Sequence, residues 1–359
     1  MEAAQYDLIV VGAGPAGSAC AITAARSGAR VLLLEKDRFP RQKVCGEFVS
    51  SESLALLHGL LVDSQFHSCP QMSSSRIFLD NKTITLPVSP PALSIPRFDL
   101  DAALFHTAQH AGVTAKEDVA VSEVRHSRIF QVATEETTFS AKAVINATGR
   151  WSKLTQFDAA GKEKWLGLKA HFTEPEPAQS VDLYFFPGGY CGVTPVGPNS
   201  INACTMVRAD IAHTLEEVFA KEPRLWQRSR CWKPLFPTVT TSPLYFREPV
   251  AESDGMLLAG DSAGFIDPFA GDGISLALQS GTLAAESISP FLRGACSLQQ
   301  AQQQYQAAYR KRFAPAFRNA ARLRRALSAP KWVRGAALTL AGIPAVGRML
   351  VRATRARAI

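Results

Sequence analysis

Two short apolar runs near the start of the chain are separated by a glycine-rich turn and a stretch of small residues. Residues 6–11 (YDLIVV) and 30–34 (RVLLL) have the length and composition of buried strands. Between them, residues 12–17 (GAGPAG) predict a turn, and residues 18–27 are Ala-rich, as a helix packed tightly on a sheet must be. Glu35 closes the second strand. This order of strand, turn, helix and strand is the dinucleotide-binding fingerprint in its required context.

Each glycine of the turn has its own physical task in such a fingerprint. Gly12 permits the tight turn, Gly14 lets the backbone approach a pyrophosphate, and Gly17 lets the helix pack closely on the strand. The helix N-terminus offers free N–H groups and a partial positive charge to the phosphates. Glu35 can accept hydrogen bonds from ribose hydroxyls. We therefore expect this end of the chain to bind a dinucleotide.

A second motif lies near the other end of the sequence and is more specific. Residues 256–259 predict a short strand, residues 260–274 read GDSAGFIDPFAGDGI, and residues 275–287 predict a helix. In this stretch the chain resembles the FAD-dependent oxidoreductases related to geranylgeranyl reductases, aromatic hydroxylases and flavin-dependent halogenases. In that superfamily the acid matching Asp261 binds the ribityl chain, and the turn matching residues 268–273 lies along the isoalloxazine. The resemblance therefore implies FAD as the cofactor.

Three further segments resemble the same superfamily. Residues 41–47 (RQKVCGE) are similar to the RxKxCGE loop beside the flavin in the reductases. Residues 95–101, followed by a helix over 102–110, are similar to an Arg-containing segment that meets the cofactor. Residues 143–149 (AVINATG) are similar to the strand and turn packed against the FAD pyrophosphate. Thr148 stands where the hydroxylases usually have an acid, which argues against a nicotinamide role for this turn but not against FAD binding.

The fingerprint and the resemblance together give a set of expected cofactor-binding residues. They are Gly12, Gly14, Pro15, Ala16, Gly17, Glu35, Lys36, Arg41, Cys45, Gly46, Arg97, Thr148, Gly149, Gly260, Asp261, Pro268, Gly271, Asp272, Gly273 and Ile274. NAD(P)H is the expected electron donor, bound transiently at the flavin, with a separate reductase or ferredoxin as the alternative. We expect no metal ligands, because the seven histidines lack metal-ligand or triad spacing and suit surface or packing positions.

Cys45, Glu47 and Tyr190 are the expected catalytic residues. Prenyl reductases of the superfamily carry a cysteine at the position of Cys45, beside the reacting alkene, where a thiol could relay a proton or only fill space. Glu47 could anchor its loop through backbone N–H groups or donate a proton, and we favour anchoring. Tyr190 and Pro195 match a YxWxFP-like motif that lines the lipid cavity in those reductases, but Gly192 replaces its Trp. The substrate should therefore differ in shape from that of a typical archaeal lipid reductase.

The two cofactor motifs lie at opposite ends of the chain, so the FAD-binding domain must be discontinuous. We expect an α/β fold in which residues 1–75, 95–160 and 245–295 form a Rossmann-like, doubly wound FAD-binding domain. Its strands should form a sheet with helices packed on it, and the substrate domain should be inserted between its parts.

The expected substrate domain consists of residues 76–94 and 165–245. Residues 165–245 contain short runs of period-two character between Pro/Gly turns, which predict an antiparallel sheet. The resemblance implies that such a sheet, above the flavin, forms the roof of the substrate site. Residues 76–94 predict a hairpin that turns at Asp80-Asn81. A helix is expected over residues 210–221.

The net charge of +8 belongs to one segment. Residues 310–359 contain thirteen Lys or Arg and no acid, and without them the chain has 26 basic against 31 acidic residues. This distribution argues against a nucleic-acid-binding face on the whole molecule. Residues 298–359 are therefore expected to form a basic, helical C-terminal region. Its mixture of basic and apolar residues favours equally an interfacial helix on an anionic membrane and a helix pair packed over the substrate domain.

Composition sets the broad class of protein. With 359 residues, 47% hydrophobic, the chain can bury a large core. We expect a cytoplasmic protein, with the inner face of the membrane as an alternative place, because the sequence shows neither a signal peptide nor an apolar run of about 18 residues. The seven cysteines fit neither a disulfide framework nor a zinc site. The sequence sets no expectation for the oligomeric state.

Two reactions fit the expected site, and the sequence favours the first. The first is a monooxygenase reaction that hydroxylates an aromatic or polyketide-like hydrophobic substrate through a flavin hydroperoxide. The alternative is reduction of a C=C bond in a prenyl or other lipid substrate. Halogenation is disfavoured because residues 48–54 lack the lysine that halogenases place after their glycine-glutamate pair. A non-enzymatic electron-transfer role is disfavoured because a roof domain would have nothing to cover.

Overall fold

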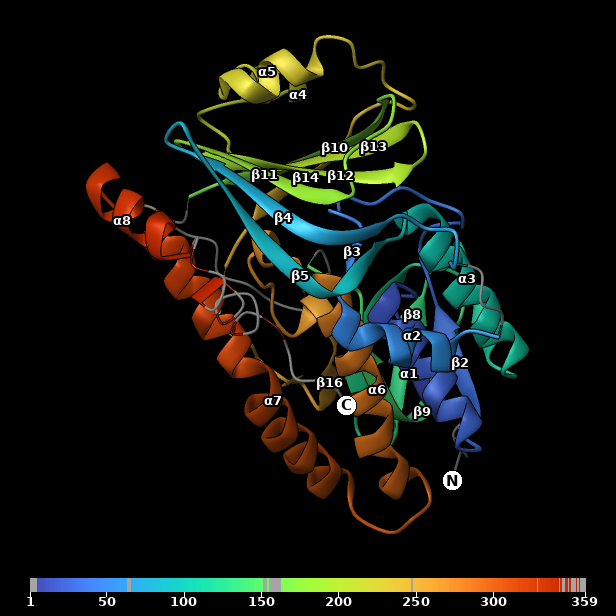
Figure 1. The fold of residues 1–359 in the computed structure, drawn as a ribbon. Coiled ribbons are helices and arrows are strands. Elements are labelled where there is room, and N and C mark those ends of the chain that lie inside the picture. Colours follow the sequence, from blue (N-terminus) through green and yellow to red (C-terminus); the bar gives the residue numbers. More distant parts are fainter. Residues whose placement is uncertain are drawn as a thin grey trace.

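The computed structural model describes residues 5–62, 66–150, 154, 163–246, 248–327 and 329–341, and positions 343, 346, 347, 349, 353 and 355. Figure 1 shows two layers, a lower sheet with helices packed on it and a second sheet above, with further helices covering its outer side. The expected α/β fold, with a Rossmann-like domain, an inserted sheet and a helical C-terminal region, is confirmed. The inserted sheet is antiparallel as expected except between β4 and β11, which pair in parallel.

The lower sheet is built around β1 (Tyr6–Val11), with the strand order β15-β16-β9-β1-β2-β6. Four strands join β1 in its parallel part: β2 (Val31–Leu34), β6 (Thr114–Lys116), β9 (Thr138–Asn146) and β16 (Met256–Leu258). Three antiparallel strands extend the sheet: β7 (Val121–His126), β8 (Phe130–Thr134) and β15 (Glu252–Ser253). Leu8, Ile9 and Val10 are wholly buried, as a central parallel strand covered on both faces requires.

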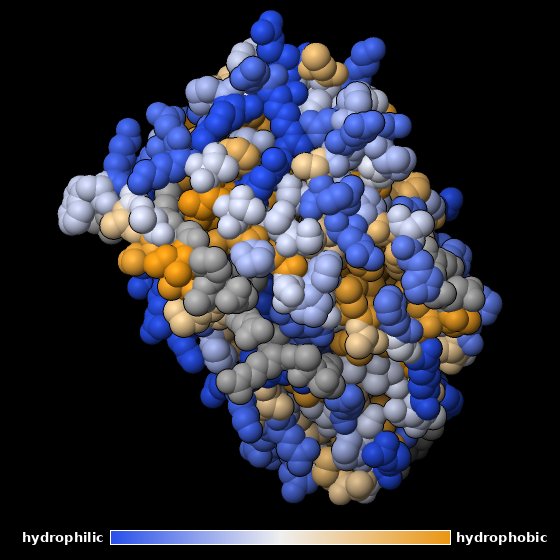
Figure 2. Space-filling model, in the orientation of Figure 1, coloured by the Kyte–Doolittle hydropathy of each residue, from blue (hydrophilic) through white to orange (hydrophobic). Residues whose placement is uncertain are grey.

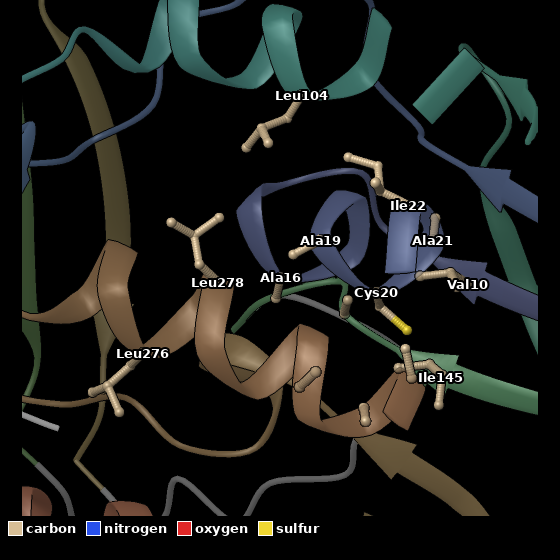
Figure 3. Close-up of a cluster of buried hydrophobic side chains, with 14 of the residues drawn as sticks. Val10, Ala16, Ala19, Cys20, Ala21, Ile22, Leu104, Ile145, Leu276 and Leu278 are labelled. Atoms are coloured by element: carbon tan, nitrogen blue, oxygen red, sulfur yellow. The ribbon is translucent and has the colours of Figure 1, made fainter. Parts of the chain in front are cut away.

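Helices α1 (Pro15–Arg26) and α6 (Gly273–Leu292) pack side by side although they come from opposite ends of the chain. A Cβ on Gly281 would overlap the backbone of Ala16, so the two helices touch at their backbones. Figure 3 shows the buried cluster around α1, with Leu104 of α3 (Arg97–His110) above it and Leu278 of α6 beside it. Small side chains on α1 permit this close approach.

The upper sheet, here called the roof, has the strand order β14-β10-β13-β12-β11-β4-β5-β3. Its strands are β3 (Phe48–Val49), β4 (Gln71–Leu79), β5 (Lys82–Ser94), β10 (Trp165–Thr173), β11 (Ser180–Phe186), β12 (Gly189–Gly197), β13 (Ser200–Arg208) and β14 (Val239–Leu244). The hairpin between β4 and β5 turns at Asp80 and Asn81, as expected, and both have positive φ, at 51° and 63°. The outer face of the roof packs against two short helices, α4 (Leu215–Phe219) and α5 (Pro223–Ser229).

Two expectations about this region were wrong in detail. The helix expected over residues 210–221 is only α4, and a second helix starts at Pro223, because proline begins a helix readily but does not continue one. Strand β4 begins at Gln71 rather than at residue 76, and β3 also belongs to the roof. The serines at the start of β4 conceal the strand pattern in the sequence.

The C-terminal region begins with α7 (Leu298–Leu327), a long helix that runs up one side of the molecule in Figure 1 and continues through Pro315. One face of α7 is buried every third or fourth residue, which fixes it to the domain of the lower sheet. The hydroxyl of the wholly buried Tyr305 donates a hydrogen bond of 2.7 Å to the Leu258 carbonyl. A last helix, α8 (Lys331–Ala341), follows near the tip of the β4–β5 hairpin. Helix α2 (Leu54–Leu60) and three 3₁₀ turns (Ser51–Ser53, Gly260–Ser262 and Pro268–Ala270) complete the described elements.

Candidate active site

The glycine-rich turn between β1 and α1 is shaped by two positions where a side chain does not fit. Gly12 has φ +96°, and a Cβ there would lie 2.5 Å from the carbonyl oxygen of Ala147. A Cβ on Gly17 would overlap the carbonyl oxygen of Gly12. Gly14 differs, since its φ is −71° and a Cβ would meet only the Arg97 guanidinium, at 3.8 Å. The turn is therefore closed toward the sheet and open on the side of Gly14.

Two uncapped helix N-termini face one cavity. Helix α1 begins after Gly14 and α6 begins at Gly273, and neither start has a side-chain hydrogen bond to its free N–H groups. Pro15 and Ala16 at the first start, and Gly273 and Ile274 at the second, line the same cavity. Free N–H groups and the positive ends of two helix dipoles suit a ligand with negative charge in two places.

Glu35 lies just after β2, with its carboxylate beside the glycine turn. Its Oε2 accepts hydrogen bonds from the Ala13 N–H at 2.9 Å and from Arg41 at 3.0 Å, and its Oε1 accepts the Asp37 N–H at 3.2 Å. Arg41 is held in turn by the wholly buried Asp101, at 2.9 Å. The carboxylate is therefore fixed at the cavity wall, where a ribose hydroxyl could donate to it.

The cavity has a volume of about 1130 Å³ and extends from the glycine turn to the inner face of the roof. Gly46, Gly149 and Gly273 also line it, and a Cβ at any of them would meet no atom within 4 Å. Open space at backbone positions, together with uncapped helix ends, fits a large nucleotide cofactor held by main-chain groups.

The sequence profile of the family described as FAD binding domain matches residues 5–321. The chain belongs to this FAD-binding family. Digeranylgeranylglycerophospholipid reductase 1 of Methanococcoides burtonii is 30% identical to it over 79% of this chain and 74% of the relative. The 1H-pyrrole-2-carbonyl-(peptidyl-carrier protein) brominase of Pseudoalteromonas luteoviolacea is 22% identical over 82% of this chain and 79% of the relative.

A solved structure of a geranylgeranyl bacteriochlorophyll reductase-like protein from Thermoplasma acidophilum has the same fold. Its TM-score is 0.81 at 22% identity, and the match covers 97% of this chain and 95% of that one. The relatives include both reductases and a brominase. The protein is thus an FAD-dependent oxidoreductase, and the comparisons leave its reaction open.

The expected cofactor-binding residues lie around the cavity of this FAD-binding protein, with two exceptions. All of them except Gly17 and Asp272 line it. Gly17 instead packs against the turn itself. The Asp272 carboxylate accepts a hydrogen bond of 3.0 Å from the buried Ser50 hydroxyl, and the Arg355 guanidinium lies 3.6 Å from it. These contacts hold the loop that precedes α6.

The loop of residues 41–47 is attached to the roof by hydrogen bonds to its backbone. Thr194 donates to the Gly46 carbonyl at 3.1 Å, and Asn202 donates to the Cys45 carbonyl at 3.0 Å. The Cys45 Sγ accepts the Glu47 N–H at 3.3 Å. Cys45 therefore lies where the FAD-binding domain meets the roof, at the wall of the cavity.

Glu47 joins a buried cluster that the sequence analysis did not identify. Its carboxylate accepts hydrogen bonds from Lys169 and from the Arg97 N–H at 2.9 Å, and lies 2.7 Å from the His171 Nε2. Glu47 itself has φ +57°, an uncommon conformation for a side chain of its size. Burial opposes ionisation, but the His171 hydrogen bond and the Lys169 charge hold the pKa of Glu47 below its usual value. The carboxylate is therefore ionised at neutral pH.

The expectation that every histidine is a surface or packing residue was thus wrong for His171. Lys169 and His171 are two residues apart on β10, so both point to the same face of the strand. The only signal in the sequence was this pair of polar residues within the apolar run LGLKAHF. The favoured anchoring role of Glu47 agrees with its contacts, because it connects the 41–47 loop, α3 and the roof.

Tyr190 and Asp267 lie near one another below β12. The Tyr190 ring packs edge-on against Phe269, with 6.1 Å between the ring centroids, and at a tilt against Phe185, with 5.5 Å between the centroids. Burial, with the charge of Asp267 and neighbouring cysteines adding to it, raises the pKa of the Tyr190 hydroxyl well above its usual value. Burial also raises the pKa of Asp267 to about 7, against the opposing effect of Arg324 at 3.0 Å. Tyr190 therefore stays protonated at neutral pH.

Within the described ranges, no group of three or more His, Cys, Asp or Glu side chains is placed to hold a metal ion.

Proposed function

We propose that the protein uses FAD to reduce a carbon–carbon double bond in a long, apolar, prenyl-like substrate. The observation that carries this proposal is the aliphatic wall of the upper cavity, formed by Ile77, Leu79, Ile84, Leu86, Val181 and Leu183 of the roof. The sequence analysis favoured hydroxylation of an aromatic or polyketide-like substrate and placed this reduction second. An extended aliphatic wall favours reduction, because a small aromatic substrate would cover only part of it.

Strand register brings the wall residues onto one face. Ile77 of β4 pairs with Ile84 of β5 on one side and with Leu183 of β11 on the other. On each strand the cavity residues are two positions apart, so their side chains point the same way. The cavity then continues to Leu323 and Leu327 near the end of α7. The aliphatic surface thus runs from the flavin-binding region to the C-terminal helices.

The size of the cavity supports two occupants. Sites for a single small molecule usually have volumes of about 300–1,000 Å³. The cavity here has a volume of about 1130 Å³, and the expected FAD-binding residues line its lower part. The upper part, under the roof, is the space we assign to the substrate.

Reduction adds a hydride to one carbon of the double bond and a proton to the other. Bound FAD, when reduced, supplies the hydride and is oxidised by two electrons. Cys45 and Tyr190 both line the cavity and could supply the proton. We assign the proton relay to Cys45. Burial raises the pKa of the Tyr190 hydroxyl, which makes that hydroxyl a poor proton donor. Glu47, Lys169 and His171 position the loop that carries Cys45.

We further propose NAD(P)H as the electron donor in a transient complex. Anaerobic mixing of the FAD-loaded protein with NADH or NADPH should bleach its yellow colour at least as fast as the enzyme turns over. If the colour persists until a reductase or ferredoxin is added, the donor is a protein partner instead.

The deciding experiment is anaerobic reoxidation. The protein is first reduced with dithionite, and geranylgeranyl diphosphate or a shorter prenyl alcohol is then added while the flavin absorbance is followed. Return of the oxidised spectrum with a saturated product supports the proposal. Oxygen-dependent hydroxylation without anaerobic reoxidation would instead support the monooxygenase. Rapid reoxidation by an electron carrier alone would support a non-enzymatic role.

A further inference from the structure

Helix α8 lies on the surface with apolar side chains that the protein does not cover. Trp332 is 78% exposed and Leu340 is 58% exposed, and further along the chain Ile343 and Met349 are 48% and 62% exposed. In Figure 2, hydrophobic side chains gather at the left edge of the molecule, where Figure 1 places α8. Such a concentration of large exposed apolar residues marks an interaction surface.

Positive charge accompanies these apolar residues. Arg318, Arg322 and Arg325 are exposed and follow one another on α7 at helical spacing, and exposed Lys331 begins α8. Residues 310–359 contain no acid to neutralise them. The partner of this surface should therefore be anionic. It should also have an apolar layer beneath its charged groups, which receives the exposed apolar side chains.

The same helix is fixed to the substrate cavity. The Arg334 guanidinium donates two hydrogen bonds to the Asp80 carboxylate, at 2.7 and 2.6 Å, across the turn of the β4–β5 hairpin. This ion pair holds the pKa of Asp80 below its usual value, so the contact persists at neutral pH. Arg334 lines the cavity together with Leu323 and Leu327 of α7. The exposed helix thus lies where the cavity meets the turn of the β4–β5 hairpin and the end of α7.

We propose that α8 and the basic end of α7 dock the protein on an anionic lipid bilayer and present the cavity to substrate in the membrane. We choose an anionic bilayer as the partner because this surface combines positive charge with exposed apolar side chains. The proposed entry of substrate rests on the proposed reductase function. No helix among the described residues is long and apolar enough to span a bilayer, so the contact is made at the surface. A prenyl-like substrate then passes from the hydrocarbon layer along an aliphatic path to the reacting position.

The test is co-sedimentation of the FAD-loaded protein with vesicles. Vesicles of phosphatidylcholine with phosphatidylglycerol are compared with vesicles of phosphatidylcholine alone, at low and high salt. We expect binding to the anionic vesicles, loss of binding at high salt, and about tenfold weaker binding for Trp332→Ser with Leu340→Ser. The matched control is Trp226→Ser on α5, since this Trp is 50% exposed and lies on the outer side of the roof.

Three results would overturn the docking proposal. They are equal binding to both kinds of vesicle, no binding at all, and unchanged binding of the α8 variant. If the α8 variant converts a dimer to a monomer during size-exclusion chromatography and vesicles do not bind, the surface contacts a second copy of the chain instead. Because the vesicles contain no prenyl substrate and binding is measured without turnover, failure of the reductase proposal leaves this result readable. The α8 variant should also keep full activity on detergent-solubilised substrate, because only delivery is altered.

Discussion

The Lys169 ammonium on β10 donates a hydrogen bond to the Glu47 carboxylate, and both side chains are wholly buried. The pair connects the roof to the loop that carries Cys45. Removing one member of a buried ion pair leaves the other charge uncompensated, which costs about 3–5 kcal/mol. Substitutions at this contact therefore test how strongly it joins the roof to the FAD-binding domain.

We expect Glu47→Gln to lower the free energy of unfolding by about 3 kcal/mol, measured by urea denaturation. The double variant with Lys169→Met should be less destabilised than the sum of the two single variants, because no lone charge remains. Glu123→Gln, which breaks an exposed pair with Arg125, serves as the control and should have no measurable effect. Additive effects of the two buried substitutions would contradict the coupling.

Gly14→Val should abolish FAD retention without unfolding the protein. The backbone of Gly14 suits any residue, and a Cβ meets only Arg97, at 3.8 Å, so the added side chain projects toward the cofactor space. The ratio of flavin to protein absorbance, with circular dichroism for the fold, checks this. Gly59→Val, at an exposed position of α2, should stay yellow. A yellow Gly14→Val protein would show that FAD is bound elsewhere.

Cys45→Ser should leave FAD bound and lower the rate of substrate reduction by at least about tenfold, if the thiol relays a proton. Anaerobic stopped-flow reoxidation of the flavin measures the rate, and the flavin content shows retention. Cys231→Ser, an exposed cysteine outside the cavity lining, is the control. Equal rates for wild type and Cys45→Ser would reduce Cys45 to a packing residue.

Asp267 should make stability depend on pH. Burial raises its pKa to about 7 from a usual 3.8, so the folded protein holds a proton that the unfolded chain releases. The contribution of Asp267 to the free energy of unfolding is therefore complete below about pH 4, and it is lost as the pH rises through about 7. Asp267→Asn should therefore flatten the fall in Tm between pH 5 and pH 8. A Tm profile unchanged by Asp267→Asn, or changed as much by exposed Glu136→Gln, would assign the pH dependence to other groups.

Gly192→Trp should shorten the substrate space. A Cβ at Gly192 would lie 3.5 Å from the Leu183 side chain, an ordinary contact, so the ring would occupy the cavity rather than distort β12. We expect retained FAD, at least about tenfold slower reduction of long prenyl substrates, and a smaller effect on short ones. Gly59→Trp is the control. Equal losses for long and short substrates would indicate damage to the roof instead of a filled cavity.

Local patterns in the sequence predicted much of this fold. The turn at residues 12–17 and the hairpin at Asp80-Asn81 could be predicted because their backbone conformations demand particular residue types. Strands β10 to β13 followed from alternation between turns. These features depend on neighbours within a few residues, which a single sequence displays directly.

The rest depends on contacts between distant segments. A lysine within a strand predicts a solvent-facing position, and only the loop packed beneath β10 supplies Lys169 with its carboxylate. The extent of the cavity depends on the register of β4, β5 and β11, which the composition of those strands does not determine. The Arg334–Asp80 contact, which places α8 at the cavity, joins residues with no sequence pattern in common.

The backbone contact between α1 and α6 has a consequence for how the protein is made. A ribosome synthesises α1 at the outset but completes α6 only after the entire roof has emerged. Until then α1 lacks its backbone contact with α6 at Ala16, and the second uncapped helix N-terminus of the cavity is missing. Flavin loading must therefore be a late event in biogenesis, and truncated nascent chains that end before Gly273 should emerge from translation colourless.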